Sequence, residues 1–237
     1  MEELEKDRES LRWFTLAWDD YVGALPLLVP VVLTQALASA GSFYIIHRWH
    51  SLLAAAPYML LVVTPLATGM NLVYIKIARG GGARYADLFS AFPVYHRAVA
   101  VSVLLSLAAM GGALLLVIPG IIIYLTFMFS EYAVVDRRTG VRESFRLSAA
   151  ITYGWKTRLF PVFTLALLIT ALVPDIYVVT GPFKSPSASL VLKPWTVAAA
   201  ALKTFVFLPW IGLAMARAYN LLLSQPAPEP QQPQADA

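Results

Sequence analysis

The stretch that decides the fold is residues 98–135, AVAVSVLLSLAAMGGALLLVIPGIIIYLTFMFSEYAVV, in which Glu131 is the only charged residue. As a single helix these 38 residues would extend about 57 Å, whereas the hydrocarbon core of a bilayer is about 30 Å thick. The chain must therefore fold back within the stretch. Pro119-Gly120 is its strongest helix breaker, because proline cannot continue a helix but is well suited to begin one. We predict the helix-break turn at Pro119 and Gly120.

The composition of the whole chain places it in a membrane. Its 237 residues are 59% hydrophobic and 14% charged, whereas a soluble domain carries about 25% charged residues. Because a spanning helix needs about 20 apolar residues, six spans are predicted, at residues 22–46, 52–75, 98–118, 119–135, 159–180 and 204–223. The predicted fold class is an all-α polytopic membrane protein, with six transmembrane helices arranged as three hairpins and with amphipathic surface helices. The absence of cysteine excludes disulfides and thiol chemistry.

The distribution of Lys and Arg indicates the orientation, because cytoplasmic loops are enriched in these residues. With a cytoplasmic N-terminus, fourteen of the eighteen basic residues fall on the inner side. They are Lys6, Arg8, Arg12, Lys76, Arg79, Arg84, Arg97, Arg137, Arg138, Arg142, Arg146, Lys156, Arg158 and Arg217; Arg48, Lys184, Lys193 and Lys203 fall on the outer side. We therefore predict a multi-pass protein of the bacterial inner membrane with both termini in the cytoplasm.

The two ends of the chain differ in character from the membrane domain at residues 22–223. Residues 1–21 carry aromatic and leucine side chains at helical spacing, which predicts a cytoplasmic amphipathic helix lying on the membrane surface with its aromatics at the headgroup level. Residues 224–237, SQPAPEPQQPQADA, contain four prolines and no large apolar side chain. We predict a disordered, Pro-rich tail there.

A shift of 58 residues aligns two of the predicted cytoplasmic loops. The matching pairs are Tyr74 with Tyr132, Arg79 with Arg137, Gly82 with Gly140, Arg84 with Arg142, Ser90 with Ser148, Ala91 with Ala149 and Tyr95 with Tyr153. The matches predict an internal repeat of a surface helix, an outward span and an inward span, with the surface helices at residues 85–92 and 142–150. The N-terminal helix would begin a third, weaker copy. Convergence of turn and helix-start residues on the same interface is the alternative.

Residues 84–160 carry a pattern of motifs. It consists of Asp87-Leu88-Phe89 and Phe92, then Ile118–Ile122, Tyr132, Asp136, Gly140, Glu143, Ser144, Ser148, Gly154, Trp155, Lys156 and Phe160. The pattern resembles uncharacterised bacterial integral membrane proteins related to the membrane domain of glycerophosphoryl diester phosphodiesterase. The resemblance implies a six-helix membrane domain and supplies no catalytic residues. Phosphodiesterase activity in that group belongs to a soluble barrel, which takes about 250 residues, so we expect none within this sequence.

Apart from Asp175 near the outer end of the fifth predicted span, Glu131 and Arg217 are the charged residues inside the predicted spans, and they lie at similar depths. An intramembrane charge is costly and usually has a partner, so we predict that the two form a buried ion pair. Snorkelling of each side chain to the interface, and a substrate or proton site, are the alternatives. His47 and His50 have the spacing of metal ligands but no carboxylate beside them. We expect neither a metal nor another cofactor.

The longest predicted cytoplasmic loop is rich in basic residues that are expected to face lipid headgroups. They are Arg137, Arg138, Arg142, Arg146, Lys156 and Arg158. The expected partners are membrane lipids, and also another membrane protein or a second copy of the chain, but not nucleic acid. No His/Asp/Glu or Ser/Lys constellation is visible at membrane depth, so we predict a non-enzymatic protein that organises the membrane or interacts with a lipid or partner. The alternative is a small transporter or channel for a lipid or hydrophobic solute.

Overall fold

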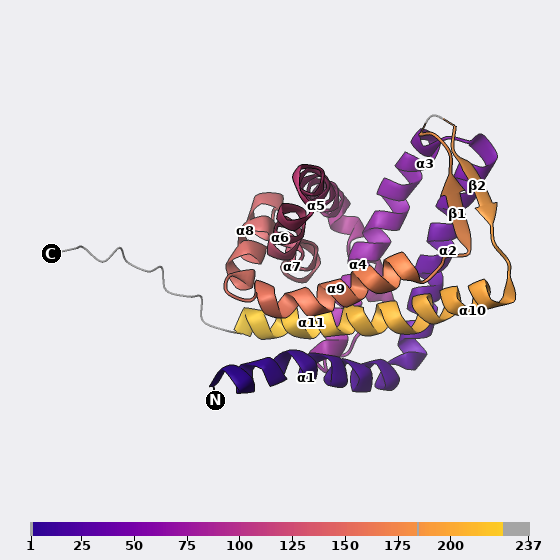
Figure 1. Cartoon of the computed structure of the whole chain (residues 1–237). Coiled ribbons are helices and arrows are strands. Elements are labelled where there is room, and N and C mark those ends of the chain that lie inside the picture. The colour runs from indigo at the N-terminus through magenta and orange to yellow at the C-terminus, as the bar shows by residue number, and fades with distance from the viewer. Residues whose placement is uncertain (1, 184, 225–237) are drawn as a thin grey trace.

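The computed structural model describes residues 2–183 and 185–224, with side chains in the first helix described from Arg12 onward. The predicted tail lies almost entirely outside these residues. The helices are α1 (Glu2–Gly23), α2 (Leu25–Trp49), α3 (Leu52–Tyr58), α4 (Thr64–Ala78), α5 (Tyr95–Leu115), α6 (Val117–Phe127), α7 (Ser130–Arg137), α8 (Val141–Thr152), α9 (Lys156–Leu172), α10 (Pro194–Leu202) and α11 (Leu208–Ser224) (Figure 1). Short π-helical segments, η1 (Met59–Val63) and η4 (Lys203–Phe207), join α3 to α4 and α10 to α11.

Five helical segments are long and apolar enough to cross a bilayer. They are Leu25–Trp49, Leu52–Ala78, Tyr85–Leu114, Val117–Arg137 and Pro194–Ser224. The pair α8 and α9 provides a sixth if it is counted as one span, although its two helices are bent by 109°. The chain is therefore a polytopic membrane protein with an all-α fold, as its hydropathy predicts.

The chain folds back between α5 and α6, but the break is at Leu116 and not at Pro119-Gly120. Leu116 has an extended backbone (φ −162°, ψ 142°), and α6 begins at the next residue. Pro119 lies in the first turn of α6, where its missing N–H has no helical partner to lose. Gly120 instead permits close packing, since a Cβ there would lie 2.6 Å from the amide nitrogen of Ala113 on α5. The predicted turn is thus displaced by three residues.

The predicted span at residues 159–180 is wrong in its second half. Helix α9 ends at Leu172, and a β-hairpin follows, made of β1 (Tyr177–Thr180) and β2 (Ser187–Leu190) in antiparallel register. Pro174 explains the end of the helix, because a proline pushes the preceding residue into an extended conformation. The hairpin packs on α2: the Tyr177 ring lies 5.0 Å from that of Phe43, and the Ala188 carbonyl oxygen lies 2.9 Å from His47 Nδ1.

The two predicted surface helices in the repeat have different structures. Residues 85–94 form two short 3-10 segments, η2 (Tyr85–Phe89) and η3 (Phe92–Val94), whereas α8 is a regular helix. The turns before them also differ. Gly80 and Gly82 have positive φ in the first copy, but Arg138 has positive φ and Gly140 does not in the second. The internal repeat therefore stays a prediction from the sequence.

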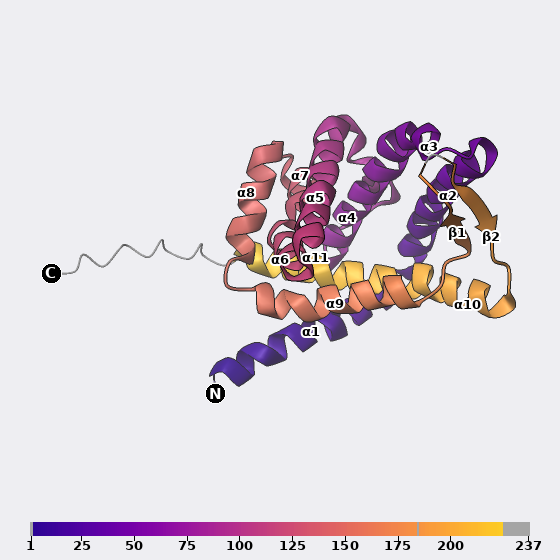
Figure 2. The ribbon, with the colours of Figure 1, turned by 45° about the horizontal axis from the view of Figure 1, so that its top comes forward.

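Helix α1 packs on the membrane domain, which corrects the expectation that its aromatic face meets only lipid headgroups. Figures 1 and 2 show α1, α9 and α11 side by side, with the N-terminal end of α1 near the C-terminal end of α11. Trp13 is 5% exposed and belongs to the largest hydrophobic core, whereas Trp18 is 44% exposed. Trp210 Nε1 donates to the Phe14 carbonyl (2.9 Å), so polar contacts also attach α1 to α11.

Candidate functional site

The predicted pair of Glu131 and Arg217 does not form. Arg217 instead donates from Nε and Nη2 to the two carboxylate oxygens of Asp20, at 2.5 and 2.7 Å. Both side chains are mostly buried, with 25% and 16% exposed. The reason is the packing of α1 on α11, which brings a carboxylate from outside the spans to the intramembrane guanidinium. A paired charge of this kind needs no second partner.

Glu131 accepts a hydrogen bond from the Ser102 hydroxyl of α5, and the described residues place no cation within ion-pair distance of it. The carboxyl group is half-buried at the start of α7. An uncompensated charge in a membrane span is costly. Glu131 and Arg217 therefore take part in different contacts, the first with Ser102 and the second with Asp20.

The Glu131→Gln protein is expected to be at least as stable as the unsubstituted protein. Glutamine keeps an oxygen that can accept from Ser102 and removes a carboxylate that lacks a cation, so no partner is left unpaired. Thermal unfolding in detergent measures the effect. A loss of more than about 1 kcal/mol would show that a cation stabilises this carboxylate, since a buried charge is strongly destabilised when its partner is removed.

A cluster of polar side chains joins the ends of α4, α7 and α11. Arg79 donates to both oxygens of Asp136 (2.6 and 2.8 Å) and from Nε to Asn220 Oδ1 (2.8 Å). Tyr219 donates to the same carboxylate at 3.2 Å. The hydrogen bonds with Asp136 raise the pKa of the Arg79 guanidinium. The cluster connects three helix ends through hydrogen bonds between its own members.

Sequence reasoning did not identify this cluster, although two of its signals are present. Arg79 is a position of the proposed repeat, and Asp136 ends one of the motifs of the family resemblance. A neighbouring contact has the same pattern: Lys76 Nζ lies 2.6 Å from Asp87 Oδ1, and Asp87 also accepts the Arg84 amide at 2.8 Å. An acid near a base at the end of a span is thus the signal that predicts these ion pairs.

The buried face of α8 carries hydroxyl groups that form hydrogen bonds with backbone groups at the break between α6 and α7. Ser148 Oγ accepts from the Phe129 amide (3.2 Å) and donates to the Thr126 carbonyl (2.9 Å). Ser144 and Thr152 lie on the same face and are also buried. Because this face points into the protein, the charged residues of α8 are directed outward.

The six predicted headgroup-facing bases have no ion-pair partner in the described residues, as is also true of Arg12, Arg84 and Arg97. Four of them (Arg137, Arg138, Arg142 and Arg146) are exposed, while Lys156 and Arg158 are half-buried. Within the described parts of the chain, the ion pairs involve Lys76, Arg79, Lys203 and Arg217, and none involves these six. Arg158 stacks on the Trp155 ring, 4.7 Å from its centroid. We call residues 137–158 the basic segment.

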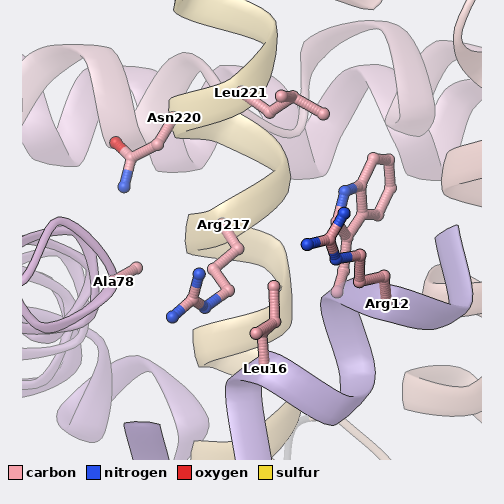
Figure 3. A pocket seen from close by; sticks show the side chains of 7 residues that line it. Arg12, Leu16, Ala78, Arg217, Asn220 and Leu221 are labelled. Carbon is pink, nitrogen blue, oxygen red and sulfur yellow. The ribbon is translucent and has the colours of Figure 1, made fainter. Parts of the chain in front are cut away.

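A cavity of about 360 Å³ lies between α1, α4 and α11, close to the polar cluster. Figure 3 shows Arg12 extending from α1 and Arg217 from α11 beside it, with Ala78 of α4 on another side. Trp13, Leu16, Asn220 and Leu221 complete its lining. The cavity therefore combines two guanidinium groups with an apolar wall.

Comparisons with models of protein families, with curated proteins and with solved structures found no match.

Proposed function

We propose that this polytopic membrane protein is a non-catalytic protein of the bacterial inner membrane that binds anionic lipid headgroups through the basic segment. One observation carries the proposal: six bases without carboxylate partners in the described residues are gathered in this one segment, whereas Lys76, Arg79 and Arg217 are paired. The charge of a paired base is offset by its carboxylate, so the base adds little to the long-range attraction of anionic lipid. An unpaired one near a membrane surface attracts anionic lipid by about 1 kcal/mol.

The net charge of the basic segment supports the same proposal. Its six bases are opposed by one acid within residues 137–158, Glu143, which is exposed on α8. Because Ser144, Ser148 and Thr152 hold the opposite face of α8 against the protein, the charges cannot turn inward. The exposed bases are thereby kept at a fixed surface where phosphate groups are abundant.

The cytoplasmic location of this surface, and of both termini, belongs to the proposal. Its support is the Lys/Arg asymmetry of the sequence. Contacts between segments that the asymmetry assigns to one side agree with it: Asp20 meets Arg217, and Arg79 meets both Asp136 and Asn220. The arrangement of the spans as three hairpins is proposed on the same grounds. So is the relationship to the membrane domain of glycerophosphoryl diester phosphodiesterase, which depends on the motifs of residues 84–160.

The proposal is tested by the selectivity for lipids. We expect replacement of Arg137, Arg138, Arg142 and Arg146 together by Gln to lower the preference for phosphatidylglycerol over phosphatidylcholine by at least about fivefold. Spin-labelled lipids of each type, added to the reconstituted protein, report the association constants. High salt should lower the preference of the unsubstituted protein too, because mobile ions screen exposed charges.

The matched control replaces Arg48 and Lys193, which are exposed and belong to the predicted outer side. Their replacement by Gln should leave the preference unchanged in the same assay. A full preference in the fourfold variant, or an equal loss in the control, would contradict a role for the basic segment.

A small transporter or channel for a lipid or hydrophobic solute is the second candidate, and Glu131 favours it. A carboxyl group inside a span with only a hydroxyl partner among the described residues is the kind of residue that serves proton relays. Proton flux into proteoliposomes that disappears in the Glu131→Gln protein would support this candidate. Flux that is absent, or equal in both proteins, would count against it.

A further inference from the structure

The cavity between α1, α4 and α11 has an excess of positive charge. Two oxygens of Asp20 occupy Nε and Nη2 of Arg217, which leaves Nη1 without a protein partner in the described structure. Arg12 is exposed, and the ion pairs found among the described residues do not include it. The lining therefore carries two guanidinium groups, of which only that of Arg217 is paired with a carboxylate in the described residues. A ligand with a single negative charge would restore the balance.

The polar groups of Asn220 do not compete for such a ligand. Its Oδ1 accepts from Arg79, and its Nδ2 donates to the Ile75 carbonyl at 3.3 Å. The amide is thus held in place by the end of α4 and forms a fixed wall. Arg12 and Arg217 supply the charged donors available to a ligand, and guanidinium groups bind the planar or tetrahedral oxygens of carboxylate and phosphate well.

Apart from Arg12, Arg217 and Asn220, the lining is mostly apolar. A free inorganic anion would gain nothing from apolar walls, whereas an aliphatic chain would. Trp13 is nearly buried. Leu16, Ala78 and Leu221 also line the cavity, and Figure 3 shows Ala78 on the side opposite Arg12. The volume is at the lower end of the range of ligand pockets, which is about 300–1,000 Å³. This space suits a headgroup with the first part of one chain and is too small to enclose a whole diacyl lipid.

We infer that this cavity binds one anionic amphiphile, with its phosphate between Arg12 and Arg217 and its aliphatic chain along Trp13, Leu16 and Leu221. The site is distinct from the basic segment, with which it shares no residue. Attraction at the basic segment is nonspecific, whereas the cavity holds a single molecule. A loss of one site should therefore leave the other intact.

The test uses the full chain in a neutral maltoside detergent, titrated by calorimetry with dodecyl phosphate, dodecylphosphocholine and inorganic phosphate. Dodecyl phosphate is expected to bind at one saturable site, and the other two probes at least about tenfold more weakly, because each lacks the net charge or the chain. Equal binding of inorganic phosphate would show an ion site without chain recognition. Equal binding of dodecylphosphocholine would show that net charge is not recognised. Either result overturns the inference, as does the absence of dodecyl phosphate binding.

Two variants locate the site. Arg12→Gln is expected to weaken dodecyl phosphate binding about tenfold without changing thermal stability, because a charge-assisted hydrogen bond is lost from an exposed residue. Ala78→Leu should also weaken binding, since the larger side chain occupies the cavity while all charges remain. Arg142→Gln, in the basic segment, is the matched control and should bind normally. Unchanged binding in both cavity variants would overturn the assignment.

Discussion

Replacement of Arg217 by Gln should lower the free energy of unfolding by about 2 kcal/mol, because it leaves the Asp20 carboxylate mostly buried without its cation. Removal of one partner from a fully buried ion pair costs about 3–5 kcal/mol. The smaller value is expected here because a quarter of the Arg217 side chain is exposed, so water screens part of the interaction. Thermal or denaturant unfolding in detergent measures the loss.

The double-mutant cycle with Asp20→Asn identifies the partner. Asp20→Asn alone should destabilise the protein by a similar amount, and the double variant should lose less than the sum of the two, since no charge is then unpaired. Arg48→Gln, at an exposed site, should have little effect. Strict additivity of the Asp20 and Arg217 variants would mean that these side chains do not interact.

Replacement of Lys203 by Met should destabilise the protein by about 3 kcal/mol, because buried acceptors that lose a donor cost about 1–3 kcal/mol each. The side chain of Lys203 is 4% exposed, and Nζ donates to the Thr170 and Val173 carbonyls (both 3.2 Å) and to Asp175 (3.0 Å). The two carbonyls belong to the C-terminal end of α9, which has no helical donors for them. Lys203, in η4, therefore caps the C-terminal end of α9.

Two further variants separate this role from the ion pair. Asp175→Asn should cost less than Lys203→Met, because the amide oxygen can still accept from Nζ and the charge of Asp175, which is 54% exposed, is partly screened by water. Lys193→Met changes an exposed lysine in the same region and should leave stability nearly unchanged. A small effect of Lys203→Met would show that water or another donor satisfies the α9 carbonyls.

Hydropathy predicts the spans because about 20 apolar residues without charge have few other uses in a protein. It predicts their ends less well. The strand Tyr177–Thr180 contains Val178, Val179 and Thr180 and is followed by Gly181-Pro182, which together are typical of a strand and a turn. The same residues also extend the apolar run of the preceding helix, so hydropathy alone assigns them to the span. At Leu116 the sequence carries no such signal, because leucine is a good helix former and does not indicate a break.

The partner of a charged residue is harder to predict from the sequence than the presence of the charged residue in a span. The helical spacing of Trp13, Ala17 and Tyr21 shows that α1 has an apolar face, but it does not show whether lipid or protein covers that face. A surface position for α1 would keep Asp20 away from the spans, and Glu131 would then be the carboxylate nearest in depth to Arg217. The polar cluster at Arg79 was missed because it joins three helix ends that are far apart in sequence.

The contact of α1 with α11 has a consequence for the order of biosynthesis. Asp20 and Arg217 are 197 positions apart, so the first helix cannot reach its final place until the last one has been translated. At about 5–20 residues per second, that interval is about 10–40 s. During it the apolar face of α1 must be covered by the bilayer surface or by a chaperone. The nascent chain thus passes through a stage in which α1 has no α11 to pack on and its apolar face needs a different cover.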